Sequence, residues 1–148
     1  MASDKDLVKL YSGRILALAA DIPHVGRLDA PSATARRRSP LCGSTVTVDL
    51  RIENGRIVDF AQDVKACALG QAAASVLGAH VIGRSREEID RGRDQLAAML
   101  RENGPVPDAP FDDLEVLLPA REFTNRHASI LLAFEATAEA LAAAVEAA

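Results

Sequence analysis

The stretch from Ser39 to Gln71 reads SPLCGSTVTVDLRIENGRIVDFAQDVKACALGQ, and it contains the clearest strand, turn and helix signals of the chain. Apolar and polar residues alternate over residues 45–52, which predicts a strand with one buried face. The apolar positions of that strand are Val46, Val48, Leu50 and Ile52. Asn54-Gly55 is a typical hairpin turn, and residues 56–65 return as a second strand. The small residues that follow Cys67 predict a helix that packs closely on the sheet.

The hairpin has two candidate registers. A two-residue turn on Asn54-Gly55 would set Leu50 against Asp59, so that one face of the sheet becomes half apolar and half charged. A three-residue loop that includes Glu53 would set Leu50 against Val58 and give one apolar face. The apolar pattern therefore favours the three-residue loop.

The two cysteines of the chain stand at the open end of this hairpin. Cys42 lies opposite Cys67 in one register and opposite Ala66 in the other, so the two backbones come within roughly 5–8 Å. Cys67 stands at or next to a helix N-terminus, where the helix dipole lowers the pKa of a thiol. Both residues could instead be small buried hydrophobes, but their pairing favours a functional site.

The bulk properties exclude several classes of protein. The 148 residues form one domain, 1–148, that is large enough for a single core. The net charge of −4 and the pI near 5.4 argue against nucleic-acid binding. No apolar run approaches a membrane span, and the first residues lack the pattern of a signal peptide. We therefore expect a cytoplasmic protein whose cysteines are thiols or ligands rather than a lasting disulfide.

The rest of the chain predicts mainly helices. An amphipathic helix is expected over residues 4–20, and a capping box at Ser85 starts another that runs to about residue 102. A short helical turn follows over residues 111–117, and Thr124 is the expected N-cap of a long last helix. With a further short strand before Cys42, the order is α-β-β-β-α-α-α. This order predicts an α+β fold, with about three antiparallel strands and helices on one face.

Cys42-Gly43 before a strand, the Asn-Gly turn and Cys67 at the start of a small-residue helix resemble the NifU-like family of iron–sulfur cluster assembly scaffold proteins. The resemblance covers most of the chain and is strongest over residues 39–83. It implies the NifU-like scaffold fold and a labile iron–sulfur cluster, or a zinc or iron ion, as the bound species. It also implies a cysteine desulfurase and recipient iron–sulfur proteins as partners, and leaves open whether a homodimer forms.

The same resemblance places a third element of the site at the start of the last helix. His127 matches a histidine of the family, whereas the third cysteine of the family falls on Ala128. Ser44 stands where the family usually has an aspartate. The remaining ligand set is Cys42, Cys67 and His127, two thiolates and one imidazole, which suits zinc or an iron–sulfur species with one further ligand.

The leading functional hypothesis is therefore a scaffold or carrier, which is not an enzyme. One alternative is a sulfurtransferase partner of a desulfurase, with Cys42 or Cys67 accepting a persulfide. Another is a regulatory paralogue of the scaffold without chemistry of its own. The basic run over residues 36–38 is open to two interpretations, a solvated charge cluster or a docking patch for an acidic partner.

Overall fold

The computed structural model describes residues 12–41 and 43–148. The first helix is α2 (Gly13–Ala20), and three strands follow it: β1 (Ala33–Arg38), β2 (Thr45–Glu53) and β3 (Arg56–Lys65). The remaining elements are α3 (Ala68–His80), α4 (Arg86–Arg101), η1 (Asp112–Glu122), η2 (Thr124–Arg126) and α5 (His127–Ala147), where η marks a 3₁₀ helix. This arrangement confirms the predicted α+β class with a three-stranded antiparallel sheet.

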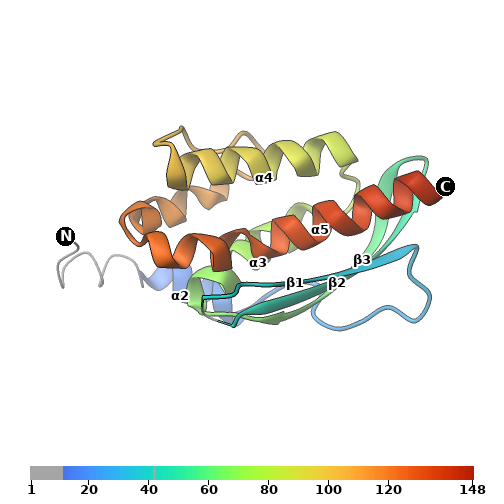
Figure 1. Cartoon of the computed structure of the whole chain (residues 1–148), viewed down its shortest axis with the longest axis horizontal. Coiled ribbons are helices and arrows are strands. Elements are labelled where there is room, and N and C mark those ends of the chain that lie inside the picture. The colour runs from blue at the N-terminus through green and yellow to red at the C-terminus, as the bar shows by residue number, and fades with distance from the viewer. Residues whose placement is uncertain (1–11, 42) are drawn as a thin grey trace.

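The elements form layers with the sheet on one side (Figure 1). The sheet has the order β1-β2-β3, and α5 packs against β1 and β2. Helix α3 lies beside α5, and α4 covers the side of α5 that faces away from the sheet. Small residues allow this close packing: α3 and α5 are rich in alanine, and most residues of both helices are buried.

The hairpin register differs from both expectations. The turn on Asn54-Gly55 has two residues, both with positive φ, and it pairs Glu53 with Arg56. A bulge then shifts the pairing between Arg51 and Ile52. The three-residue loop, which the pattern favoured, is therefore wrong.

The bulge explains how the turn and the apolar pattern are both satisfied. It leaves Val58 without a partner in the register and 38% exposed, and it brings Leu50 opposite Phe60. A two-residue turn without the bulge would have set Leu50 against Asp59. One inserted residue thus restores the apolar face that the sequence pattern requires.

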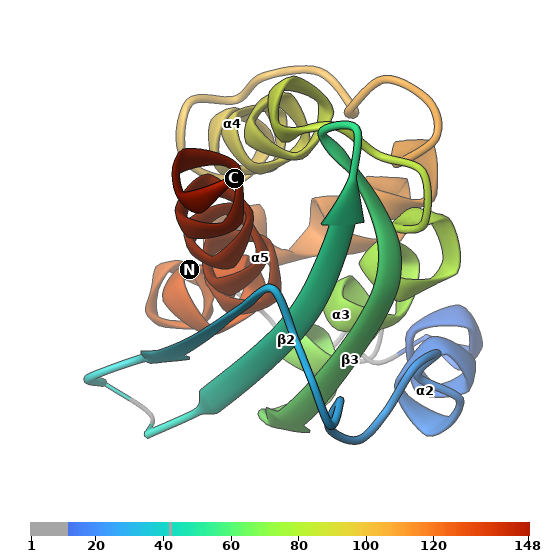
Figure 2. The same ribbon diagram turned by 90° about the vertical axis from the view of Figure 1, so that its right-hand side faces the viewer.

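The segment between α2 and β1 covers part of the other face of the sheet. It runs along β3, where the Gly26 N–H donates to the carbonyl of Gln62, and then crosses β2 to reach β1 (Figure 2). Beneath this segment lies Asp49, whose carboxylate is completely buried. This face of the sheet is therefore not uniformly exposed.

Four donors surround the carboxylate of Asp49. Arg27 donates from Nε to Oδ2 at 2.6 Å and from Nη2 to Oδ1 at 3.2 Å. The Leu28 N–H donates to Oδ2 at 3.0 Å, and the Thr34 hydroxyl donates to Oδ1. The Arg27 guanidinium is the main reason that the pKa of Asp49 lies below its usual value; burial opposes this shift, and the other donors add to it.

The helix boundaries confirm some expectations and correct others. The capping box of Ser85 and Glu88 is present, and α4 ends at Arg101, one residue before the expected end. Ser12 is the N-cap of α2 and is not helical, so an unbroken helix over residues 4–20 is wrong; residues 1–11 lie outside the described part. Thr124 begins the η2 turn instead of capping α5, whose N-cap is Arg126.

The segment Thr124–Ala147 is long and apolar enough to cross a membrane by length and composition alone. The expectation that no apolar run approaches a membrane span is therefore wrong on that measure. However, 67% of this window is buried inside the protein, because α5 packs between the sheet and α4. Its apolar character thus belongs to a core helix.

Candidate functional site

Cys67 occupies the N-cap of α3, two residues after β3 ends. Its backbone is extended, and the thiol is half-buried and free. The N–H groups of the first helical turn have no partners within the helix, so they point toward this position. The sequence correctly predicted that Cys67 stands at a helix N-terminus.

These surroundings favour the thiolate. Burial is the largest single influence and raises the pKa of Cys67, but the donors around the sulfur outweigh it and the pKa is lowered. The donors are the Gly70 N–H, the Ser129 hydroxyl, the Arg126 side chain and the Leu69 N–H. A thiolate is the form that binds soft metal ions and attacks sulfur.

Ser129 brings α5 into the site. Its Oγ lies 3.6 Å from the Cys67 sulfur and donates a hydrogen bond to Ser44 Oγ at 3.1 Å. Both serines are buried. Because a hydroxyl proton can rotate, the Ser129 hydroxyl can turn toward the sulfur when Cys67 becomes a thiolate.

Gly70 explains how the two helices come so close at this point. A Cβ on Gly70 would lie 2.9 Å from Ser129 Oγ and 3.0 Å from the Ser129 carbonyl oxygen. Any side chain here would push the start of α5 away from α3. The missing side chain of Gly70 therefore permits the contact between Ser129 and Cys67.

The turn before β2 supplies the other wall. The Ser39 N–H donates to the Ser44 carbonyl at 2.8 Å, and the Gly43 N–H donates to the Ser39 carbonyl at 2.9 Å. Gly43 has a φ of 71°, which favours glycine. Cys42, the predicted partner of Cys67, lies outside the described residues, so the proximity of the two thiols stays a prediction.

His127 is buried at the first position of α5. Its Nε2 lies 2.9 Å from the Ala120 carbonyl, and because a carbonyl only accepts, Nε2 carries the proton. In the neutral imidazole, Nδ1 is then the nitrogen with a free lone pair. This is the arrangement that orients a histidine ligand, yet the role of His127 as a ligand stays a prediction.

A complete metal centre is not present in the described part of the chain. Within residues 12–41 and 43–148, no group of three or more His, Cys, Asp and Glu side chains could hold a metal ion. The described site offers one thiol, that of Cys67, and two serine hydroxyls, which are poor metal ligands at neutral pH. It can hold a soft ion only with further ligands from Cys42, His127, a substrate or a partner.

Sequence reasoning missed the contact of Ser129 with Cys67. It assigned the approach of α5 to His127 and to the position of Ala128, whereas the contacts come from Arg126 and Ser129. Residues three apart share one face of a helix, so the spacing of Arg126 and Ser129 could have indicated this pair.

The comparisons with known proteins agree on one family. The NifU-like N terminal domain matches residues 10–112 of this chain. The chain is 26% identical over 118 residues to the iron-sulfur cluster assembly scaffold protein IscU of Streptococcus pyogenes, covering 80% of this chain and 74% of that protein. It is 25% identical over 132 residues to the protein of the same name from Thermotoga maritima, covering 89% and 92%.

Solved structures extend this similarity over nearly the whole chain. The N-terminal part of a nitrogen-fixing NifU-like protein from Brucella abortus superposes with a TM-score of 0.94 at 44% identity, covering 97% of this chain and 99% of that one. A putative iron-sulfur cluster assembly scaffold protein for the SUF system from Fervidobacterium islandicum gives a TM-score of 0.78 at 20% identity, covering 89% and 96%. The second likeness supports the fold alone.

Proposed function

Because this chain belongs to the NifU-like N-terminal domain family, we propose that it is a scaffold or carrier for iron–sulfur cluster assembly and not an enzyme. In this proposal Cys42 and Cys67 bind iron or zinc together with sulfide, and the assembled cluster is a labile cargo. Two relatives carry the name of iron-sulfur cluster assembly scaffold proteins, which supports the general role.

The observation that carries the proposal is the setting of Cys67. Its thiol is half-buried at the start of α3, and the donors around it hold its pKa below the usual value. A half-buried sulfur whose pKa is lowered forms the thiolate more readily than an ordinary cysteine, which suits a ligand for a cargo that must leave again. A structural cysteine in a core would instead be neutral and inert.

Each candidate residue has a role in the proposal. Cys67 and Cys42 are the thiolate ligands, and His127 binds through Nδ1 while Nε2 donates to the Ala120 carbonyl. Ser129 positions the Cys67 sulfur from α5. A cysteine desulfurase in the cytoplasm supplies the sulfur, and recipient iron–sulfur proteins take the product.

The decisive experiment is an anaerobic analysis of bound iron, zinc and acid-labile sulfide after purification and after reconstitution. We expect metal with the wild type, and a loss of most of it in Cys67→Ser, which keeps the size of the side chain. His127→Asn should lose part of it, whereas His80→Asn, a histidine that packs edge-on against Phe111, should lose none. Metal retention in Cys67→Ser, or sulfur held only as a persulfide without metal, would contradict the cluster role.

A gain of affinity tests the placement of α5. Ala128 is half-buried between His127 and Ser129, at the position where the family has a cysteine. Ala128→Cys should lengthen the lifetime of the reconstituted cluster, because a third thiolate joins the set. The matched control is Ala128→Ser, which adds a side chain of similar size with a poor ligand. Equal lifetimes in the two variants would remove Ala128 and His127 from the site.

A further inference from the structure

The open face of the sheet carries a polar hollow at the same end as Cys67. Three strands line up there, with Arg36 opposite Thr47 opposite Asp63 in one row. The next row places Thr45 opposite Lys65. Together with Arg27 and Thr34, the two rows line a hollow of about 400 Å³. Lys65 ends β3 two residues before Cys67, so the hollow adjoins the candidate site.

The hollow offers donors that nothing in the described structure uses. Arg36 and Lys65 are exposed, and neither forms an ion pair within residues 12–41 and 43–148. The side-chain hydroxyls of Thr45 and Thr47 likewise have no hydrogen-bond partner among those residues. Arg27 is different, because its guanidinium is committed to Asp49.

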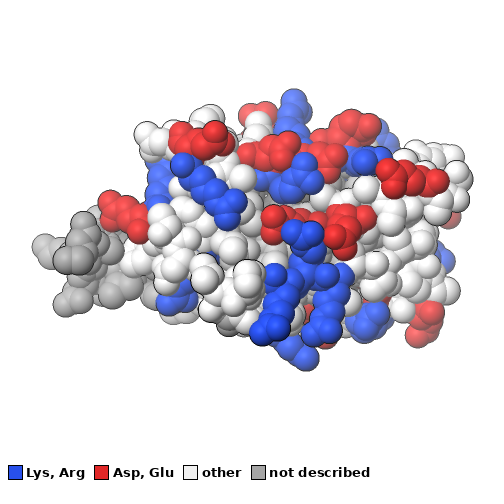
Figure 3. All heavy atoms as spheres, in the orientation of Figure 1, with Lys and Arg blue, Asp and Glu red and all other residues white. Residues whose placement is uncertain are grey.

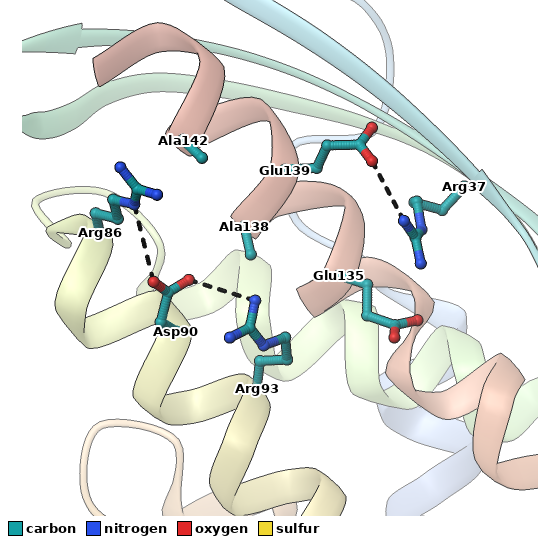
Figure 4. Close-up of a pocket in the computed structure, with 8 residues that line it drawn as sticks. All are labelled: Arg37, Arg86, Asp90, Arg93, Glu135, Ala138, Glu139 and Ala142. Carbon is teal, nitrogen blue, oxygen red and sulfur yellow. Dashed lines mark hydrogen bonds and ion pairs between the residues drawn. The ribbon is translucent and has the colours of Figure 1, made fainter. Parts of the chain in front are cut away.

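Arg37, the neighbour of Arg36 in β1, is by contrast neutralised by an ion pair. Arg37 points to the helical side of the sheet and pairs with Glu139 of α5 at 3.2 Å (Figure 4). The pocket around it, between β1, α4 and α5, also pairs Arg86 and Arg93 with Asp90. That pocket therefore neutralises its own charges, whereas the hollow on the open face keeps an excess of positive charge.

The surface charge follows the same division. Figure 3 shows Lys and Arg side chains gathered over β1 near the lower edge of the molecule, while both signs alternate over α4 and α5. The whole chain has a net charge of −4, so Arg36 and Lys65, which are unpaired among the described residues, make the hollow more positive than the rest of the surface. Such a local contrast steers and orients a partner of opposite charge.

We propose that this hollow binds an acidic segment of a partner protein, which docks on the open face of the sheet beside Cys67. The inference rests on the proposed function, since it names the chemistry of a partner that would meet the scaffold at its thiol. Carboxylates of the segment accept hydrogen bonds from the Arg36 guanidinium, which can bind one in a two-pronged manner, and from Lys65. The hydroxyls of Thr45 and Thr47 line the floor as neutral donors.

Asp63 limits and orients this docking. It lies in the same row as Arg36 and Thr47, so a carboxylate of the segment is repelled from that side of the hollow. The segment therefore binds toward Arg36 and Lys65. Removal of the charge of Asp63 should therefore strengthen binding of the segment. If the segment bound elsewhere and this cluster were only solvated, the same change would have little effect.

The test uses the full chain and a hexaglutamate peptide as probe, with a hexaglutamine peptide as neutral control. Binding and its location are followed by calorimetry and by backbone NMR shifts at low salt. We expect Arg36→Gln and Lys65→Gln each to weaken hexaglutamate binding about two- to fivefold, as for single exposed ion pairs. Asp63→Asn should strengthen it, and added salt should weaken it.

Two matched controls lie on the same face, farther along the strands. Arg51 and Asp59 pair with each other at 3.8 Å, so Arg51→Gln and Asp59→Asn make the same charge changes outside the hollow. The proposal is overturned if Arg51→Gln weakens binding as much as Arg36→Gln, if the NMR shifts spread evenly over the surface, or if hexaglutamine binds equally well. Metal retention should stay unchanged in all these variants. A negative result for peptide binding therefore leaves the scaffold proposal intact. Conversely, peptide binding can still be measured if the protein proves to hold no metal.

Discussion

Asp49 in the sheet and Cys67 beside it are both acidic groups, but their surroundings differ. The carboxylate of Asp49 is enclosed by donors, whereas the thiol of Cys67 remains accessible. The Asp49 carboxylate is completely buried, and each oxygen accepts two hydrogen bonds from fixed donors. The Cys67 thiol is half-buried, and the Ser129 hydroxyl approaches its sulfur only at the long distance of 3.6 Å. Both groups have a lowered pKa, but only Cys67 keeps free coordination space.

The difference separates structure from function in this fold. A carboxylate with every lone pair satisfied joins the covering segment to the sheet and can bind nothing else. A thiolate that is stabilised by backbone donors, one hydroxyl and the Arg126 side chain still has room for a metal ion or a sulfur atom. Four experiments test this contrast, in order of decreasing expected effect.

Asp49→Asn should have the largest effect. The amide NH₂ would face a donor whichever way it turns, so at least one hydrogen bond is replaced by repulsion inside the protein. We expect the free energy of unfolding to fall by about 2–4 kcal/mol, measured by urea denaturation. Asp59→Asn, on the neighbouring strand β3 and partly exposed, should change it by less than about 0.5 kcal/mol. Equal effects of the two variants would mean that Asp49 is not structural.

The second experiment follows stability with pH. The folded state holds the pKa of Asp49 below its value of about 3.9 in an unfolded chain, so the carboxylate stabilises the fold fully above that pH. This stabilisation is lost as the pH falls through the folded pKa. The stability difference between wild type and Asp49→Asn should therefore be constant near neutral pH and shrink below about pH 4. A constant difference down to pH 2 would contradict this assignment.

Gly70→Ala should disturb the contact between α3 and α5. The new Cβ would meet Ser129 at 2.9–3.0 Å, so a helix must shift, at a cost of about 1–3 kcal/mol of stability. The control is Gly13→Ala, because nothing lies within 4 Å of a Cβ there. Gly13→Ala should be neutral or stabilising by up to about 1 kcal/mol. If both variants melt like the wild type, the close approach at Gly70 does not hold the site together.

Ser129→Ala should have the smallest effect, confined to the reactivity of Cys67. Loss of the hydroxyl removes one donor to the sulfur and raises the pKa of Cys67. In a Cys42→Ser background, alkylation by iodoacetamide at pH 7 should slow by about two- to tenfold, the equivalent of one neutral hydrogen bond. Ser75→Ala is the control, because its buried hydroxyl donates to the Asp21 carbonyl on the far side of α3. An unchanged rate in Ser129→Ala would mean that α5 does not tune the thiol.

The local pattern predicted much of the fold. Alternation over residues 45–52, the Asn-Gly turn and the capping box at Ser85 each gave the element that the structure contains. They succeeded because each depends on residues at most a few positions apart. The prediction of the hairpin register was wrong for the same reason. The bulge between Arg51 and Ile52 allows a two-residue turn together with an apolar face farther along the strands, and no short stretch of sequence contains both features.

The candidate site divides along the same line. The position of Cys67 at a helix N-terminus could be predicted from local sequence, since the end of one strand and the small residues of the next helix flank it. The residue that contacts Cys67 depends on how the chain packs, because Ser129 lies 62 positions away and approaches where Gly70 leaves space. The burial of Asp49 likewise depends on the tertiary structure, because Arg27 and Leu28 cross the sheet to reach it. Local periodicity determines which face a side chain takes, but packing between distant segments determines its neighbours.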